Sequence, residues 1–548
     1  MQLSINKWLF LCAALVSLTF LGCEDFLDVP AEDALTSDNF FTTRNNVESF
    51  TVGAYATLKA GGMFANGIGH NAITSDVMRT AQFNSQGGLG TYRMSASNNQ
   101  LSNLWANMYT GIATANSVVT QIQERVPEDA DFETADLIGE ARFIRAHYYF
   151  HLVRLFGDVP LVLDQVVTVD QAQVGRSSVA EVYNAIVADL EFAMANCLSK
   201  AEVAGYGRVS NEAATALLAK VLLWRGNYID LGTIEGDAAA DYARSAELAE
   251  QVINSGQYSL VEYYPDVFSR FSKYHDENLF EVQYETADLG GCVGCAMGIS
   301  KQWNSGGAWT NILGTQFLYT FYDSTDLVRR KWTVTKASIE RVQGELVLTS
   351  YENPRFFENL MRAKNRDATS YVFLGGTQSW PSWEPTRLAK FRRWPLRPEE
   401  LGVFEHQSFK IHDPLLRYAE VLLIFAEATN EANNGPTEAA YDAVNQVRAR
   451  ARNYPEVGID FLVDGISQPA IEVREEAVPD WNGMDYATFR EEILNERVRE
   501  LAGEQGCMRW YDLVRRGVLV EKIRFLNDFN NPLTGNLEPW WTNQQGPG

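Results

Sequence analysis

Apolar residues recur at intervals of three and four along most of the chain, the spacing that places them on one face of an α-helix. This spacing predicts helices over residues 45–60, 99–125, 135–156, 178–196, 211–226, 239–255, 413–433, 437–452 and 486–502. Short strands are predicted at 279–284 and 346–348, where apolar residues alternate or cluster. The chain is therefore expected to be mainly α-helical with minor β-structure.

The middle of the chain lacks this spacing. Residues 286–312 and 353–400 contain glycine, proline and tryptophan without helical or strand periodicity. Glycine and proline interrupt regular elements, so both segments are expected to form long, ordered loops.

Three of the predicted helices share one arrangement of apolar residues. The offsets 0, 4, 7 and 11 start at Val179, Tyr242 and Ala440, and each of these helices follows another apolar helix. Such pairs are typical of tetratricopeptide-like hairpins stacked into a superhelix. The same offsets suit any amphipathic helix, so the spacing alone leaves both interpretations open.

The first residues have the pattern of an export signal. Lys7 precedes an apolar stretch, 8–20, that is too short to span a bilayer, and Gly22 and Cys23 follow it. We interpret residues 1–22 as a signal peptide. The site at Cys23 resembles that of bacterial lipoproteins, so we expect this cysteine to be lipidated. An ordinary secreted protein is the alternative.

Composition and charge narrow the class of protein. Hydrophobic residues make up 46% and aromatic residues 12% of the 548 residues, as in a globular protein. The 46 basic and 70 acidic residues give a net charge of −24, which would repel a phosphate backbone. No basic run offsets this charge. Nucleic acid is therefore not an expected partner.

The cysteines are too few for a disulfide scaffold in a chain of this length. Beyond the first 23 residues the sequence contains Cys197, Cys292, Cys295 and Cys507. Cys292 and Cys295 lie among glycines and are candidates for a small-loop disulfide. Unpaired thiols and a metal or redox site are the alternatives.

Signatures of enzymes are absent from the sequence. It has no P-loop, no His-Glu-x-x-His and no Gly-x-Ser-x-Gly motif. His147 and His151 are four residues apart on a predicted helix, where a metal would need at least one further ligand. We interpret them as packing or surface histidines and expect neither a metal nor a cofactor.

Several segments together resemble one known family. They are the residues after Cys23, the stretches 141–160 and 413–427, and the C-terminal segments 493–503 and 509–517. In this order they resemble the SusD/RagB family of lipoproteins. Acidic residues directly after the lipidated cysteine, as found here, resemble the signal for the outer face of the outer membrane.

The resemblance implies a fold, a location and a role. Residues 23–548 would form a single SusD-like domain, with an N-terminal part at 23–260 and a C-terminal part at 261–548. Four tetratricopeptide-like hairpins would support a loop-rich ligand-binding face. Family members sit on the outer membrane, capture oligosaccharides or other nutrients, and cover a SusC-like TonB-dependent transporter. They bind and do not cleave.

The charged residues of the family motifs are interpreted as structural. Glu496 and Arg499 are expected to pair on the exposed side of the last long helix. The remaining charged motif residues are expected to anchor helix ends and loops. They are Asp326, Arg329, Arg330, Arg509, Asp512, Arg515 and Arg516.

Candidate ligand contacts lie in aromatic loops. Proteins bind sugars with exposed rings for the apolar faces and with amide, carboxylate or guanidinium groups for the hydroxyls. The stretch 301–311 combines both kinds of group and is the first candidate, with Trp303, Asn304, Trp309 and Asn311.

Two further stretches have a similar composition. The second candidate contains Trp380 and Trp383. The third contains Asp76, Arg79, Phe83 and Tyr92, and the resemblance implies it, because the family often places contacts there. The alternative for each ring is packing of its loop onto the helices, as expected for Trp105, Trp224 and Trp510 in the core. The rival functions are peptide capture by the same scaffold and a surface glycoside hydrolase.

Overall fold

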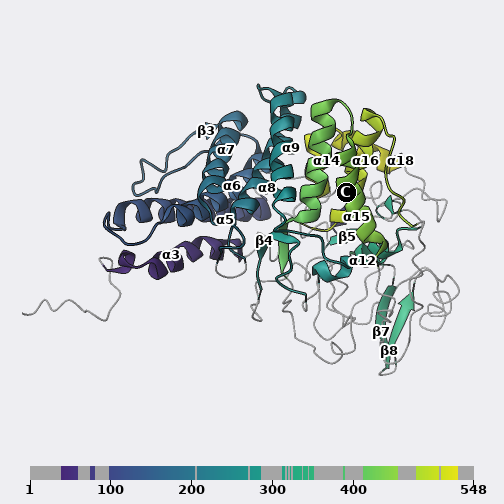
Figure 1. Ribbon diagram of the computed structural model, residues 1–548, viewed down its shortest axis with the longest axis horizontal. Coiled ribbons are helices and arrows are strands. Elements are labelled where there is room, and N and C mark those ends of the chain that lie inside the picture. Colours follow the sequence, from purple (N-terminus) through teal and green to yellow (C-terminus); the bar gives the residue numbers. More distant parts are fainter. Residues whose placement is uncertain are drawn as a thin grey trace, which may run out of the picture.

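The helices of the chain pack side by side in pairs (Figure 1). The computed structural model describes residues 39–59, 75–80, 98–203, 207–268, 272–284, 312–314, 318, 321–322, 325–335, 337–342, 345–350, 387–388, 412–453, 477–504 and 508–528. Within these ranges the predicted mainly helical class is confirmed, and two of the predicted helices, 99–125 and 135–156, have the predicted bounds.

The pairs form two sets of helices that differ in burial. The first members are α5 (Asn99–Arg125), α7 (Val179–Asn196), α9 (Ala238–Asn254) and α15 (Glu438–Arg452). The second members are α6 (Ala135–Phe156), α8 (Asn211–Asp230), α14 (Tyr418–Asn433) and α16 (Tyr486–Leu501). In α6, 18 of 22 residues are buried, whereas in α5 only 9 of 27 are. In the first three pairs the second member thus forms the interior and the first member covers it with one apolar face. In the fourth pair α15 and α16 are about equally buried, with 8 of 15 and 8 of 16 residues buried.

Local sequence signals set the helix ends. Ser178 and Glu181 form a reciprocal capping box at the start of α7, which satisfies backbone N–H groups that have no partner in the helix. Asn98 accepts from two backbone N–H groups at the start of α5. Asn434 ends α14 in the left-handed conformation, with φ of 52°.

One glycine permits a close approach between α5 and α6. A Cβ atom at Gly111 would lie 2.1 Å from Cε2 of Tyr148, whose side chain is fully buried. The hydroxyl of Tyr148 lies 2.7 Å from Oγ1 of Thr57 and is fixed from that side as well. Only glycine therefore fits at this crossing.

The prediction of a helix from residue 413 is wrong for its first turn. Residues Asp413–Arg417 form strand β10, which pairs antiparallel with β4 (Asn278–Val282) and is buried along its whole length. Helix α14 begins only at Tyr418. The partner strand lies far away in sequence, so the local apolar spacing could not reveal the pairing.

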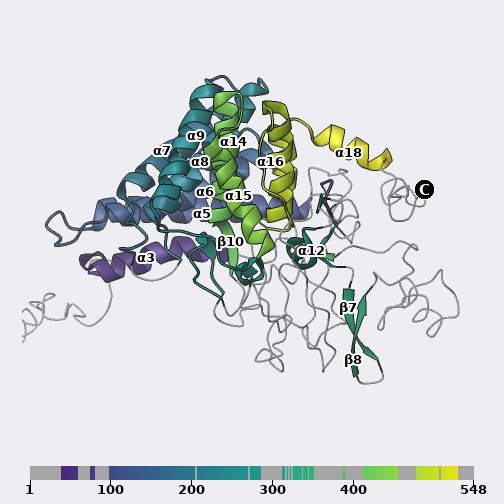
Figure 2. The ribbon, with the colours of Figure 1, turned by 45° about the vertical axis from the view of Figure 1, so that its right-hand side comes forward.

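The remaining strands form short antiparallel pairs. These are β1 (Met78–Thr80) with β5 (Ile312–Gly314), β2 (Val159–Pro160) with β3 (Arg176–Ser177), β6 (Val334–Thr335) with β9 (Arg387–Leu388), and β7 (Ala337–Val342) with β8 (Glu345–Ser350). Strands β4 and β8 confirm the two predicted strands at 279–284 and 346–348. Figure 2 shows β7 and β8 away from the helical body.

Shorter helices complete the described chain. They are α3 (Arg44–Ala56), α12 (Leu327–Thr333), α17 (Met508–Arg515) and α18 (Leu519–Asp528), with 3-10 turns at Phe40–Thr42, Thr57–Lys59 and Tyr264–Phe268. Helices α9 and α14 pack together, so residues before and after position 260 share one core. None of the helices in the described ranges has the length and apolar character needed to cross a bilayer.

Candidate functional site

Most of the predicted ligand contacts lie outside the described residues, but the strands next to them in the chain are described. Lying outside the described residues are Phe83, Tyr92, Trp303, Asn304, Trp309, Asn311, Trp380 and Trp383. Asp76 and Arg79 are described, Arg79 by its backbone on β1. The geometry of the candidate site is therefore built from the strands to which the candidate stretches are joined.

The ladder between β1 and β5 brings two candidate stretches to one place. Thr80, the last residue of β1, is paired with Ile312, the first residue of β5. The third candidate stretch continues the chain directly after Thr80, and the first ends directly before Ile312. Because paired Cα atoms in an antiparallel ladder are about 5 Å apart, both stretches join the fold at the same point.

The second candidate stretch joins the fold nearby. Strand β9 begins at Arg387, four positions after Trp383, and it packs beside β5. β9 also pairs with β6, which directly follows α12. We call the three strands β1, β5 and β9 the strand cluster. Candidate stretches that are far apart in sequence are therefore joined to neighbouring strands.

Asp76 fastens the strand cluster to the helical body. Its carboxylate accepts hydrogen bonds from Nε and Nη2 of Arg509 on α17, at 3.0 and 2.8 Å, and its side chain is fully buried. Arg509 also donates to the backbone oxygen of Leu494 on α16, at 3.3 Å, and its guanidinium lies 5.3 Å from the ring centre of Phe321. In this arrangement Asp76 positions β1, and its carboxylate faces Arg509.

Among the described residues, four arginines have at most 1% exposure: Arg329, Arg417, Arg497 and Arg515. We call them the buried arginines. Each pairs with at least two acidic side chains, drawn from Glu277, Asp326, Glu420, Glu427, Glu496, Glu500, Glu504 and Asp512. Buried charges are tolerated when they are paired and hydrogen-bonded, so this network fixes the relative positions of α12, α14, α16 and α17.

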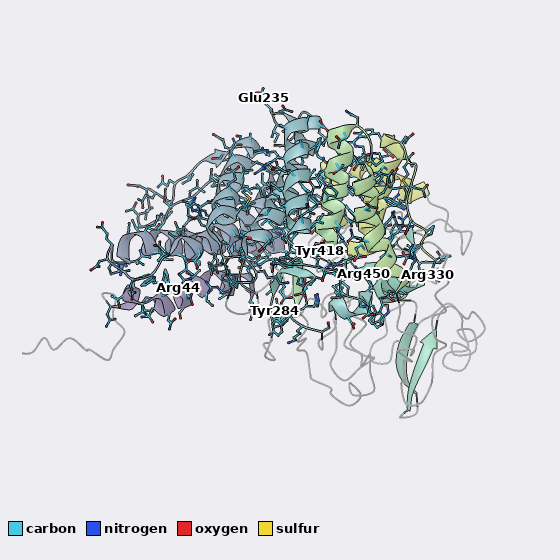
Figure 3. All side chains as sticks on the ribbon, in the orientation of Figure 1. Arg44, Glu235, Tyr284, Arg330, Tyr418 and Arg450 are labelled. Carbon is cyan, nitrogen blue, oxygen red and sulfur yellow. The ribbon has the colours of Figure 1, made fainter. Side chains whose placement is uncertain are left out.

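Glu277 joins the network to the start of β4. Its backbone oxygen accepts a hydrogen bond from the N–H of Tyr418, at 2.8 Å, and its carboxylate accepts from Arg450, at 2.9 Å, and from Arg417. Figure 3 labels Tyr418 at the start of α14 and Arg450 near the end of α15. Glu277 thus connects the β4–β10 pair to the ends of two helices.

The expected pair of Glu496 and Arg499 forms, but its predicted location on the exposed side of the helix is wrong, because Glu496 is fully buried and Arg499 is only 16% exposed. Glu496 has no exposed surface and bonds Arg329 at 2.6 Å and Arg448 at 2.7 Å, as well as Arg499 at 2.8 Å. Burial raises the pKa of Glu496, but the charges of the surrounding arginines outweigh it and hold the pKa well below its usual value. Arginines from three helices converge here, which spacing within one helix could not indicate.

The predicted anchoring roles are confirmed for six of the other charged motif residues: Asp326, Arg329, Arg509, Asp512, Arg515 and Arg516. Asp326 and Arg329 form a buried pair at 2.6 Å. Arg515 bonds Glu427 on α14 at 2.8 Å, and Asp512 bonds Arg497 at 3.0 Å. The charges of these arginines outweigh burial and lower the pKa of both Glu427 and Asp512.

The two histidines of α6 are packing residues, as predicted. His147 and His151 are buried, and their ring centres are 4.7 Å apart. The ring of His147 lies against Phe143 and Phe280. The described residues contain no cluster of histidine, cysteine and carboxylate side chains suited to hold a metal.

The three tryptophans that were predicted to lie in the core differ in burial. Trp224 is fully buried, which confirms it as a core residue, while Trp105 and Trp510 are half-buried. Cys197 is a buried free thiol whose pKa is raised by burial. Cys23, Cys292, Cys295 and Cys507 lie outside the described residues.

Family models match both ends of the chain. Residues 25–223 match a family described as starch-binding and associating with the outer membrane, and residues 405–547 match the SusD family. A relative over nearly the whole length is SusD-like protein P25 of Formosa agariphila, 25% identical over 95% of this chain and 92% of the relative.

Solved structures share the fold. A SusD homologue from Bacteroides thetaiotaomicron has a TM-score of 0.71 at 21% identity, over 92% of this chain and 93% of its own. A structure with a xylogluco-oligosaccharide has a TM-score of 0.62 at 22% identity, covering 88% of this chain and 85% of its own. A laminarin-binding SusD-like protein has a TM-score of 0.61 at 20% identity, covering 91% and 96%.

Proposed function

Because this chain belongs to the SusD/RagB family, we propose that it is a cell-surface protein that captures oligosaccharides. One observation carries the proposal for this chain: the pairing of Thr80 with Ile312 joins two aromatic, amide-rich stretches to the fold at one point. Rings and amides gathered at one base can engage the faces and the hydroxyls of a single glycan. Relatives of the same fold are described with laminarin and with a xylogluco-oligosaccharide, which supports this ligand class.

In this proposal the ligand contacts are the candidate residues of the three stretches. Trp303 and Trp309 stack on sugar faces, Asn304 and Asn311 bond hydroxyls, and Trp380, Trp383, Phe83 and Tyr92 extend the surface. Arg79 belongs to the same site through β1. Asp76 has the supporting role described above, since its carboxylate faces Arg509.

Isothermal titration calorimetry with a panel of oligosaccharides tests this function. Trp303→Ala and Trp309→Ala should each weaken binding of a recognised glycan by roughly ten- to a hundredfold, which corresponds to ~1–3 kcal/mol of lost stacking. Their melting temperatures should stay near that of the wild type. Binding of peptides alone, or a recognised glycan bound unchanged by both variants, would contradict the assignment.

The location and the partner complete the proposal. Residues 1–22 direct export, lipidated Cys23 holds the mature chain on the outer membrane, and captured glycan passes to a SusC-like TonB-dependent transporter. The family description of proteins associating with the outer membrane supports this location. Metabolic labelling with a fatty acid tests the anchor, because the label should be lost in Cys23→Ala. The protein binds without cleaving, so no new reducing ends should appear when it is incubated with its glycan.

A further inference from the structure

Asp413, the first residue of β10, is a buried carboxyl group that no base neutralises. The residue is 3% exposed. Within the described residues its Oδ1 atom has no hydrogen-bond partner, and no cation contributes to its electrostatic surroundings. A carboxylate that is buried in this way is normally paired with a cation or held by several donors. The surroundings of Asp413 therefore suit a neutral acid better than an ion.

The nearby carboxylate of Glu281 on β4 holds donors of its own. Nδ1 of His412 lies 2.8 Å from its Oε1 atom, and the side-chain amides of Gln283 and Asn278 donate to it at 3.2 and 2.5 Å. Burial raises the pKa of Glu281, but the hydrogen bond and the charge of His412 outweigh it, so that the pKa is lowered. Glu281 is therefore a carboxylate ion beside Asp413.

A second carboxylate near Asp413, that of Glu504, is held in the same way. Arg417 donates to its two oxygens from Nε at 2.6 Å and from Nη2 at 2.9 Å. Burial, together with the charges of Glu504 and Glu281, raises the pKa of Asp413 well above its usual value. Of these three carboxyl groups, Asp413 is thus the one that keeps its proton.

The other ionisable groups around Asp413 do not offset these charges. The hydroxyl of Tyr284 is buried without a partner among the described residues, and its pKa is raised by burial and by the charge of Asp413. Lys59 lies 5.6 Å from the ring centre of Tyr284, and Lys273 donates to its backbone oxygen at 3.2 Å. Lys220 of α8, which also packs against β10, is paired with a carboxylate of α14. None of these three lysines bonds Asp413.

Asp413 lies where one end of the first candidate stretch joins the fold. It is paired with Val282 on β4 in the antiparallel ladder. We call the pair Val282–Asp413 the β4–β10 junction. Residues 285–311, which contain Trp303 and Trp309, connect this end of β4 to β5. Figure 3 labels Tyr284, where the chain leaves the junction, beneath the helices. The segment that carries both tryptophans is thus held at one end by the junction.

We propose that Asp413 stays protonated in the folded chain and, as a neutral acid, keeps the β4–β10 junction closed, so that loss of its proton to solvent opens the junction and weakens glycan capture. The ionised form would place a third negative charge beside Glu281 and Glu504 with no donor to receive it, and separation of the strands relieves this repulsion. Asp413 is then a positioning residue for Trp303 and Trp309. This inference rests on the proposed function, because it concerns the same glycan site.

Urea unfolding between about pH 5 and pH 8 tests the protonation of Asp413. Because its pKa is raised in the fold, the native state binds one proton more than the unfolded chain, in which an aspartate ionises near pH 3.9. The unfolding constant of the wild type should thus rise relative to that of Asp413→Asn by about tenfold for each pH unit until the proton is lost. Asp413→Asn should be the more stable protein at pH 7.

The matched control for this measurement is Asp480→Asn, in an exposed pair with Arg452. Its stability should follow that of the wild type at every pH. If Asp413→Asn is less stable than the wild type at pH 7, or if the difference between them does not vary with pH, Asp413 is ionised and held by a partner, and the inference is overturned.

Hydrogen exchange and calorimetry with laminari- and xylogluco-oligosaccharides, between about pH 6 and pH 9.5, test the effect on the site. In the wild type, protection of the amides at 279–282 and 413–417 and affinity for a recognised glycan should both fall about tenfold or more as pH rises. In Asp413→Asn both should stay constant.

Two outcomes of this second experiment would overturn the inference. One is a wild type whose protection and affinity stay constant over the whole range, and the other is an equal fall in Asp413→Asn, which would assign the effect to another group such as His412. A wild type that binds none of the oligosaccharides at any pH would instead reject the proposed capture function, while the stability and exchange results would still decide the state of Asp413.

Discussion

The guanidinium carbon of Arg515 lies 4.0 Å from the ring centre of Trp224, and both side chains are fully buried. Arg497, at 5.2 Å, and the Nζ atom of Lys220, at 5.8 Å, lie over the same indole. A desolvated cation over a tryptophan face is worth about 2 kcal/mol. Trp224 therefore joins the apolar core of α8 to the ion network of the C-terminal helices.

Replacement of Trp224 should lower stability strongly. Trp224→Ala would leave a large cavity and remove the ring that faces three cations, so we expect a loss of ~3–5 kcal/mol in the free energy of unfolding. Trp224→Phe, which keeps a ring, should lose less. Urea denaturation of both variants measures the difference. A loss below about 1 kcal/mol in Trp224→Ala would contradict the role assigned to this ring.

Glu496→Gln should destabilise the protein in a manner that depends on pH. The variant removes the charge that Arg329, Arg448 and Arg499 share, and breaking a buried network of this kind costs ~3–5 kcal/mol. Since the pKa of Glu496 is lowered in the fold, its contribution is present above the unfolded value, about 4.3, and is lost as pH falls toward the folded pKa. The difference from wild type should thus be full at pH 7 and shrink below about pH 4.

A surface variant is the control for this experiment. Glu247 pairs with Arg244 on α9 but is 55% exposed, so Glu247→Gln should change the free energy of unfolding by less than about 0.5 kcal/mol. A cost of Glu496→Gln that is equally small, or that does not vary with pH, would show that the network is not held together by charge.

Two glycine variants separate helix propensity from packing. Gly111→Ala places a methyl group against the buried ring of Tyr148 and should cost ~1–3 kcal/mol through overpacking. Gly53→Ala on α3 meets no atom within 4 Å and should stabilise the protein by ~0.5–1 kcal/mol. Thermal melts of both variants check the opposite signs. A stabilising Gly111→Ala would contradict the close approach of α5 and α6.

Asp76→Asn should loosen the strand cluster. The variant leaves Arg509 buried beside a neutral amide, so β1 loses its charged link to α17. The backbone amides of β1 and β5 should therefore exchange faster with solvent. If the proposed glycan site rests on this cluster, glycan affinity should fall as well. Asp480→Asn, in an exposed pair with Arg452, is the control and should change neither property. Unchanged exchange at residues 78–80 in Asp76→Asn would reject the anchoring role.

The helices could be predicted from sequence because each carries its own signal. The apolar spacing of residues 99–125 and 135–156 returned the observed bounds of α5 and α6, since those helices bury one face or nearly their whole surface. The prediction of a helix over residues 413–417 was wrong because β10 depends on pairing with β4, a contact between distant segments. Local periodicity describes one element and carries no information about its partner.

The candidate site was less predictable than the fold. Composition selected the stretch 301–311 and the one that contains Trp380 and Trp383, but it could not indicate that Thr80 and Ile312 are paired or that β9 lies beside β5. Asp76 was chosen as a ligand contact because its stretch lies where the family often places contacts, whereas its charge is engaged by Arg509. The burial of the buried arginines could not be predicted from sequence either. Arg417 looks like a surface residue in sequence and has no exposure in the fold.

The contact between Asp76 and Arg509 joins residues 433 positions apart in the chain. During synthesis the N-terminal segment emerges first, so Asp76, which precedes β1, cannot meet Arg509 until almost the entire polypeptide has followed. A polypeptide that stops before α17 could form its early helical pairs and still lack the fastened base of the candidate site. A truncated polypeptide of this kind would therefore lack the charged link between β1 and α17 even if its early helices were intact.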